Sequence, residues 1–559
     1  NTTGTNNTAV GRGAMYTNTV GFDNIAVGVN ALIFNTTGYR NVAIGKDSLK
    51  TNTIGKENTA VGHNALNANT TASYNTAVGQ DALKANTTGQ FNTAVGRQTL
   101  QANTIGHQNV AIGQGAMFSN ITGEENTAVG NNALVYNTTG RFNTAVGYQA
   151  LKENTIGSNN VAMGWESLRD NTTGIQNVAI GYRALAANTT SNLNIGIGFQ
   201  AFTTNTTGGS GDIALGGYAL RHNTTGKENI AIGYMALMGN TIGEDNTAVG
   251  FESLKANTTG TNNTAVGHRT LYNNTIGTSN IAIGRSAMYN NTTGINNVAV
   301  GRKALQLNTI GIDNVAIGYS AMYTNTTGIE NTAIGFQTLR ENTTGSYNTA
   351  IGHEVLLRNT TGQYNIGVGS SALYTNTIGQ YNTGVGYGTL KSNTTGVKNT
   401  AIGVNTLTTN TTGKDNVAVG YNCMRYNVSG QRNVAMGWDA LNQNTTGNDN
   451  TAVGYYALRN NTTGVKNIAI GHTALRSNTI GVQNQAIGYE ALYANTTGLN
   501  NTALGHQSLR LNTIGIDNIA IGRTSLYGNT TGSYSTAVGR GSLGSNTTGQ
   551  KNTGFGWKA

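Results

Sequence analysis

The sequence predicts an all-β fold, a β-solenoid (parallel β-roll or β-helix) of about 33 coils with 17 residues each (559/17). The motif Asn7–Gly11 returns as Asn24–Gly28 and Asn41–Gly45, and it continues at the same spacing to Asn552–Gly556. Self-similarity at a short fixed period, with a strand-like core, is typical of stacked coils that bury their apolar faces against their neighbours. Proline, which cannot donate to a hydrogen-bond ladder, is absent. Its absence indicates that each coil pairs with the coils above and below.

One continuous domain over residues 1–559 is expected, because no linker, charge block or change of composition interrupts the period. At a strand spacing of ~4.8 Å the coils would form a rod on the order of 160 Å long. The single register break is a one-residue insertion near 209–211, inside Gly208–Asp212. This segment superficially resembles a glycine-rich calcium turn, but its aspartate is out of phase and the pattern is not repeated. We therefore expect a local bulge.

Composition narrows the class of protein. The excess of 33 Lys and Arg over 23 Asp and Glu is spread over variable positions, as on a solvated face or one weakly attracted to anionic surfaces. No basic cluster indicates a nucleic-acid site, and no apolar run is long enough to span a bilayer. The chain starts inside a motif, as a processed segment of a longer protein would. The lone Cys423 excludes an intrachain disulfide framework and is expected to be a small buried residue.

The coil 75–91 illustrates the predicted core. Thr76–Val78 is a short strand whose side chains alternate between two faces. The Val78 position is always bulky and apolar, whereas the Ala77 position holds only Ala or Gly. The Leu83 position, always Leu, Met or Phe, adds a second apolar row beside small residues of the Ala82 type. We expect these two apolar rows to form a thin core, with the Ala77 face either approaching another chain or lining a tight interior.

Three repeated residues are predicted to shape the corners. Gly79 and its equivalents are invariant, as at a corner that needs positive φ or close backbone approach. Asn86 is also invariant, and asparagines stacked in successive coils can form an amide ladder that satisfies turn groups. Gly89 marks a second corner, relaxed only at Ala72 and Ser191.

The string Asn177–Ala184 (Asn-Val-Ala-Ile-Gly-Tyr-Arg-Ala) closely resembles the head repeats of trimeric autotransporter adhesins, the YadA-like heads, and similar strings occur in phage and bacterial tail-fibre proteins. The resemblance covers the whole chain. It implies left-handed β-rolls, association of three chains and binding to host or matrix surfaces. The family's usual repeat is shorter, and the heptads, neck and membrane anchor of the family do not occur in these residues.

The residue after the invariant glycine is the most informative variable site. Aromatic side chains occupy it in runs of successive coils, at Tyr148, Trp165, Tyr182 and Phe199 and again at Tyr421, Trp438, Tyr455 and Tyr489, with His472 between the last two. Such stripes on an outer edge are candidates for stacking on sugars or contacting proteins. The alternative is that the rings only stack on one another and stiffen the coil stack.

Catalytic and metal sites are not expected, and neither is a cofactor. His63, His268, His353, His472 and His506 share the aromatic site but lie at least two coils, or ~10 Å, apart. That spacing is too large for one metal ion, whose ligands lie about 2 Å from it. No repeated Asp, Glu, His or Ser–His pair provides the constellation of an enzyme.

Two further interpretations concern the Asn-Thr-Thr corners. They match the N-glycosylation pattern at Asn35, Asn86, Asn137, Asn257 and Asn461. Ladder asparagines should point inward, however, and glycans every ~4.8 Å would crowd, which favours incidental matches. Threonine ladders at the Thr76 and Thr87 positions also raise ice binding as a less favoured function, because Val, Ile and Thr interchange at the first of them.

The sequence therefore favours a non-enzymatic extracellular or cell-surface rod or fibre with adhesin-type surface binding. The expected partners are copies of the chain, as a trimer or an end-to-end filament, and a host or matrix surface that could include carbohydrate. No nucleic acid and no direct membrane insertion are expected. The alternatives are a self-assembling filament, with or without glycans, and a plain spacer shaft.

Overall fold

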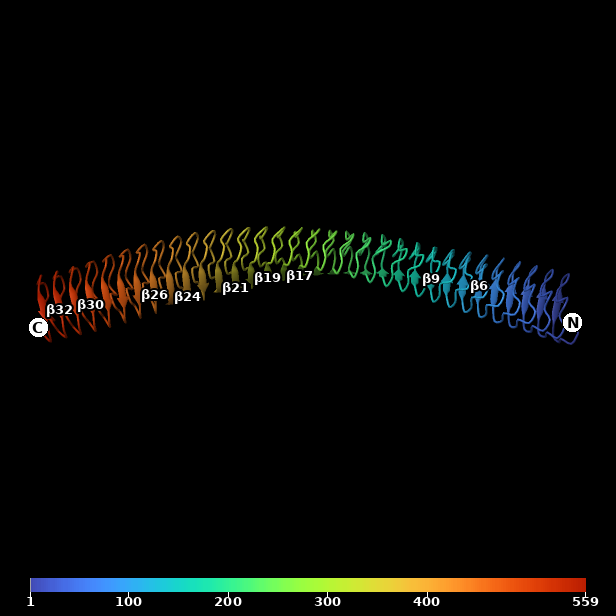
Figure 1. Ribbon diagram of the computed structural model, residues 1–559, viewed down its shortest axis with the longest axis horizontal. Coiled ribbons are helices and arrows are strands. Elements are labelled where there is room, and N and C mark those ends of the chain that lie inside the picture. The colour runs from blue at the N-terminus through green and yellow to red at the C-terminus, as the bar shows by residue number, and fades with distance from the viewer. Residues whose placement is uncertain (1) are drawn as a thin grey trace. The chain divides into compact units, whose positions relative to one another are not determined.

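The computed structural model describes residues 2–559, and in this range every regular element is a β-strand. The chain divides into two compact units, one ending at Ser279 and the other spanning Asn280–Ala559. Each unit is a stack of turns with one strand per turn (Figure 1). The predicted all-β solenoid is thus confirmed in both units, while a single continuous domain stays a prediction.

The strands are short, mostly of three residues, and pair in parallel with the next turn. Unit 1 contains β1 (Thr8–Val10), β2 (Ile25–Val27), β3 (Val42–Ile44), β4 (Thr59–Val61), β5 (Thr76–Val78), β6 (Thr93–Val95), β7 (Val110–Ile112), β8 (Thr127–Val129), β9 (Thr144–Val146), β10 (Val161–Met163), β11 (Val178–Ile180), β12 (Ile195–Ile197), β13 (Ile213–Leu215), β14 (Ile230–Ile232), β15 (Thr247–Val249) and β16 (Thr264–Val266). Unit 2 contains β17 (Ile281–Ile283), β18 (Val298–Val300), β19 (Val315–Ile317), β20 (Thr332–Ile334), β21 (Thr349–His353), β22 (Ile366–Ser370), β23 (Thr383–Val385), β24 (Thr400–Val404), β25 (Val417–Tyr421), β26 (Val434–Met436), β27 (Thr451–Val453), β28 (Ile468–Ile470), β29 (Gln485–Ile487), β30 (Thr502–Leu504), β31 (Ile519–Ile521), β32 (Thr536–Val538) and β33 (Thr553–Phe555).

The register follows the sequence period. Thr76 of β5 pairs with Thr93 of β6, 17 residues on. At the insertion Ile195 of β12 pairs with Ile213 of β13, and the following pair, Ile213 with Ile230, has returned to the usual spacing. The extra residue is accommodated in the turn before β13, so the strands on either side keep their pairing.

The core is narrower than the sequence suggested. Ala77, Ala82 and Leu83 are fully buried, but Val78 is 37% exposed. The expectation that the Val78 row belongs to the core is therefore wrong. The Ala77 row faces the tight interior, not another chain. The interior has room only for a small side chain at this position. Gly196 is the equivalent of Ala77 in its turn, and a Cβ added there would lie 3.0 Å from Leu185 Cγ. Alternation along the strand then turns the larger Val78 outward.

Backbone hydrogen bonds join successive turns on every side of the coil. The amide of Thr76 donates to Asn92 O at 2.8 Å, that of Leu83 to Thr99 O at 3.0 Å, and that of Thr87 to Thr104 O at 2.9 Å. The interturn pairing predicted from the absence of proline is confirmed, because a proline at any of these places would remove a donor.

The Asn86 ladder is confirmed, and a second asparagine row accompanies it. Asn86 Nδ2 donates to Asn69 Oδ1 of the preceding turn and to Gly89 O of its own turn, both at 3.0 Å. Asn75, which precedes the strand, also donates its Nδ2 to Gly89 O at 3.0 Å and to Asn58 Oδ1 at 3.3 Å. One carbonyl thus receives two buried amides and closes the turn.

The two glycine corners have different causes. Gly79 has φ +136°, a conformation strained for other residues, and a Cβ there would also overlap the carbonyl of Gly96. Gly89 lacks a positive φ but is confined by Gly106 O and by the amides of the asparagine rows. Ala72 and Ser191 show that this second corner can widen enough to hold a small side chain.

Substitution of a ladder asparagine tests its contribution. Asn137 Nδ2 donates to Asn120 Oδ1 at 2.8 Å and to Gly140 O at 3.0 Å, and Asn154 Nδ2 donates to Asn137 Oδ1 at 2.8 Å. Asn137→Ala should lower the free energy of unfolding by about 2–4 kcal/mol, since it leaves buried partners unsatisfied. Denaturant unfolding followed by circular dichroism measures the loss.

Asn131→Ala is the matched control, because Asn131 is exposed in the same turn. Equal stability losses for the two variants would contradict a special role of the ladder.

Candidate functional site

The predicted aromatic residues form an exposed row in unit 1. Trp165 is 49% exposed, Tyr182 and Phe199 are exposed to a similar degree, and Tyr148 is half-buried. Tyr148 stacks on Trp165 with ring centroids 4.2 Å apart, and Tyr182 stacks on Phe199 at 5.2 Å. The rings therefore stack between turns and are also partly exposed to solvent.

Unit 2 repeats this arrangement. Tyr421 stacks on Trp438 at 4.2 Å, and all four predicted rings are exposed: Tyr421, Trp438, Tyr455 and Tyr489. Histidines extend the row, since Tyr455, His472, Tyr489 and His506 follow one another at 5.0–5.2 Å. These histidines serve as stacking members. Among the described residues no group of three His, Cys, Asp or Glu could hold a metal ion.

A second aromatic row went unnoticed in the sequence. Tyr347, Tyr364 and Tyr381 each precede the first asparagine of a turn and stack in parallel, with centroids 4.8 and 5.0 Å apart and planes within 2°. All three are exposed. Their spacing of 17 residues was the available signal, but in most turns this position holds a charged or other polar residue.

The sequon asparagines are enclosed by the ladder. Asn35, Asn86, Asn137, Asn257 and Asn461 are all fully buried. The Nδ2 of each, the atom that would carry a glycan, already donates to an asparagine of the preceding turn and to a corner carbonyl, as Asn257 does to Asn240 Oδ1 and Gly260 O. A glycan would replace one of the two Nδ2 hydrogens and break that bond, and it would also have to enter the buried ladder, so glycosylation of the folded chain is unfavourable.

The two threonine ladders differ in their accessibility. Thr87 Oγ1 donates to Thr104 O at 3.0 Å, and the same bond recurs in most turns, so these hydroxyls are engaged within the solenoid. The Thr76 row instead lies on the outward strand face beside Val78. Ice binding through this mixed face stays a prediction that thermal hysteresis would test.

Cys423 is chemically protected. It is fully buried, with Sγ 3.2 Å from Gly437 O, and burial raises its thiol pKa to about 12. The thiolate needed for reactivity is therefore scarce at neutral pH. The prediction of a small structural residue is confirmed.

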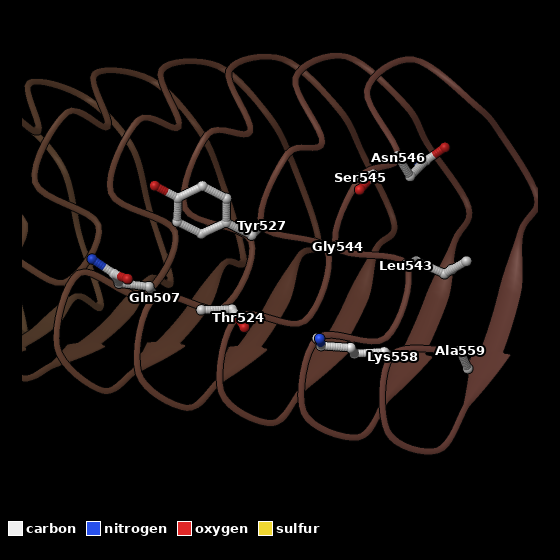
Figure 2. A pocket seen from close by; sticks show the side chains of 10 residues that line it. Gln507, Thr524, Tyr527, Leu543, Gly544, Ser545, Asn546, Lys558 and Ala559 are labelled. Atoms are coloured by element: carbon white, nitrogen blue, oxygen red, sulfur yellow. The ribbon is translucent and has the colours of Figure 1, made fainter.

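A hollow of about 860 Å³ lies at the last turn (Figure 2). Leu543 forms part of its lining and is half-buried, whereas Leu526, its equivalent one turn earlier, is fully covered by the turn that follows. The hollow is thus a cross-section of the apolar core without a covering turn, and its shape gives no indication of a ligand.

Within residues 2–559, Asp212 is the one buried carboxyl in the asparagine rows. It occupies the place that Asn75 has in its own turn, directly after the insertion. Asn229 donates to Asp212 Oδ1 from its backbone amide at 2.8 Å and from Nδ2 at 3.1 Å. An ionised aspartate has no donor for Gly226 O, the corner carbonyl that an asparagine would reach. The sequence interpretation placed this residue out of phase and missed its position in the row.

The environment of Asp212 favours its neutral form. Burial raises its pKa to about 7, the hydrogen bonds from Asn229 oppose this shift, and the nearby charges of Glu228 and Glu244 add to it. A protonated carboxyl also regains an O–H donor, which the ladder lacks when the group is ionised.

Comparison with models of known protein families and with curated proteins finds no match to the chain. Residues 2–559 contain no helix with the length and apolarity of a membrane span. Any functional assignment therefore depends on the surfaces themselves.

Asp212→Asn should restore the donor and remove a pH dependence. Because the folded pKa exceeds the ordinary 3.8, the folded state holds a proton that the unfolded state releases, and stability falls as pH rises from about 4 to about 7. The variant should be more stable than the parent by on the order of 3 kcal/mol at pH 8, with a smaller difference at pH 4. Denaturant unfolding at the two pH values measures this.

The control is Asp245→Asn, which changes an exposed carboxyl in a nearby turn. Parallel pH profiles for the parent and Asp212→Asn would contradict the assignment of the buried proton.

Proposed function

We propose that the chain is a non-enzymatic structural rod or fibre element of the cell surface or extracellular space, which assembles with copies of itself and contacts other surfaces through its aromatic rows. The observation that carries the proposal is the outward face of the strands. Large, continuous apolar surfaces on soluble proteins mark interaction sites.

This outward face carries no ionised residue in either unit, and its Val78 row is apolar throughout, whereas its Thr76 row mixes Thr with Val and Ile. The first and third residues of the strands point outward, as Thr76 and Val78 do, and the 33 strands carry only Thr, Val, Ile, Leu or Met there apart from Gln485 and Phe555. Ionised residues are instead confined to the turns. A solvated face would tolerate charge, so its exclusion from every strand supports a contact surface.

The size of the face suits a stable association. Sixteen rungs at ~4.8 Å give unit 1 a strip roughly 75 Å long, and two outward residues per rung make it about 10 Å wide. The resulting area of roughly 750 Å² is close to the ~800 Å² that each partner buries in a standard interface. The flat parallel strands would let a second copy approach over the full strip.

The resemblance of Asn177–Ala184 to adhesin head repeats supports a trimer as the first form to test, with an open-ended filament as the alternative. The contact would use the Val78 row, because the Ala77 row is enclosed. The first aromatic row follows the strands, and the row of Tyr347, Tyr364 and Tyr381 precedes them. Both rows lie outside this strip and would remain free to bind protein or sugar surfaces.

Charges placed on the strip should prevent assembly. We expect the parent to scatter light as a trimer, three times 58.1 kDa, and Ile317→Glu with Ile334→Glu to give single chains, because a buried unpaired carboxylate is costly. Size exclusion with light scattering measures the mass.

The control pair is Ile310→Glu with Ile378→Glu, which alters isoleucines that are more exposed but lie at a corner. A parent of single-chain mass would overturn the assembly proposal, and an open-ended distribution would replace the trimer with a filament.

The aromatic rows predict a separate binding phenotype. Trp165→Ala with Trp438→Ala should weaken retention on a panel of immobilised neutral glycans at least tenfold, since each exposed indole offers a stacking face. Phe142→Ala, at an exposed ring outside this row, serves as control. Unchanged retention, or no retention by the parent, would favour a plain spacer shaft.

A further inference from the structure

A gap in one side-chain row creates a basic hollow in unit 1. The residue after the buried leucine carries a long side chain in most turns, for example Lys152, Arg169 and Arg221. Ala186 and Thr203 occupy this place in the two turns between Arg169 and Arg221, and they are the only consecutive pair of such small residues in the row. The missing side chains leave a hollow of about 230 Å³.

The walls of the hollow are cationic. Arg169, Arg183 and Arg221 line it, together with Gln200 and His222. Three arginine side chains therefore border this one hollow. Since each guanidinium offers a planar set of N–H donors, the lining suits a carboxylate better than a neutral group.

The nearby carboxylates are too few to neutralise the three arginines. Arg169 binds Asp170 through Nε at 2.6 Å and Glu166 through Nη1 at 3.0 Å. Arg183 Nε shares the same Glu166 Oε2 at 3.2 Å. Two carboxylates therefore face three arginines.

Of these three arginines, Arg221 is the one for which the described residues provide no ion pair. Its guanidinium lies 5.1 Å from the ring centre of Tyr218. Thr204 Oγ1 donates to Arg221 O at 2.7 Å and fixes its backbone.

Burial and the charge of Arg221 both lower the pKa of His222, so this imidazole is a neutral hydrogen-bonding group at neutral pH.

The volume limits the ligand to about one sugar ring. The hollow of about 230 Å³ spans the two turns that carry Ala186 and Thr203, which is the scale of a single ring. The amide of Gln200 and the hydroxyl of Thr203 add neutral polar groups to the lining, of the kind that binds sugar hydroxyls. Exposed rings of Tyr182 and Phe199 directly precede Arg183 and Gln200 in the same two turns.

We propose that this hollow binds a monosaccharide unit bearing a carboxylate, with Arg221 and Arg183 holding the carboxylate. This proposal names a ligand class for the surface binding proposed above, and it rests on that proposed function for its biological meaning. Its chemistry requires neither assembly nor the tryptophans of the aromatic row.

Calorimetric titration of the full chain with sodium glucuronate tests the proposal, with glucose and inorganic phosphate as comparison probes. We expect saturable glucuronate binding at one site per chain, with affinity at least tenfold above that for glucose and for phosphate. Absence of saturable binding would overturn the site. Equal affinity for glucose would show that the arginines do not recognise the carboxylate. Equal affinity for phosphate would show that the site does not recognise the sugar ring.

Two variants locate the binding. Arg221→Gln should weaken it at least tenfold, and Ala186→Lys should abolish it by filling the hollow with the side chain that Lys152 and other turns carry at this place. Arg425→Gln is the matched control, because Arg425 occupies the same place in unit 2 and also lies over a tyrosine, Tyr426. Binding that survives Ala186→Lys would overturn the location.

The same titration separates this proposal from the proposed function. If the protein has a single-chain mass and still binds glucuronate, the binding site is supported and the assembly proposal is contradicted. A trimer that retains neutral glycans but does not bind glucuronate would sustain the proposed function and overturn the site.

Discussion

The structure depends on a bifurcated contact: two buried asparagine amides donate to one corner carbonyl, as Asn75 and Asn86 do at Gly89 O. Each asparagine also bonds the one in the neighbouring turn, so the contact closes a coil and aligns it with the next. A 17-residue coil with one short strand has little apolar area per turn. Satisfying every buried amide is therefore a condition for the fold, because an orphaned polar group would cost about as much as the turn gains from its leucine.

The ladder also explains the thinness of the core. The corner carbonyl and the two amides occupy one end of the coil, and the strand must approach the buried leucine closely, so that only Ala or Gly fits between them. The backbone accommodates this geometry with left-handed residues: Asp81 has φ 56° and Leu83 has φ 49°. A leucine in this conformation is strained. Its full burial and the interturn hydrogen bonds offset that strain in every turn.

Function can then reside only in what the repeat leaves variable. The outward strand positions vary among Thr and apolar residues, which suits one extended uncharged contact, whereas the turn positions vary freely and create local features. The aromatic rows, the basic hollow and the buried Asp212 are all departures confined to a few turns. Such departures leave the stack intact because each turn depends mainly on its immediate neighbours.

The sequence by itself determined the period, the parallel solenoid, the interturn pairing, the Asn86 ladder and the glycine corner at Gly79, since each follows from a residue that recurs in every turn. It also located the first aromatic row, whose members stand at one fixed position. Only the tertiary structure decided which strand face lies inside. Alternation separates Ala77 from Val78, but the width of the closed coil, set by the ladder, places the small residue inward and the larger one in solvent. The role of Asp212 and the hollow over Ala186 were hidden for the same reason: both depend on groups from adjacent turns that meet only when the coils stack.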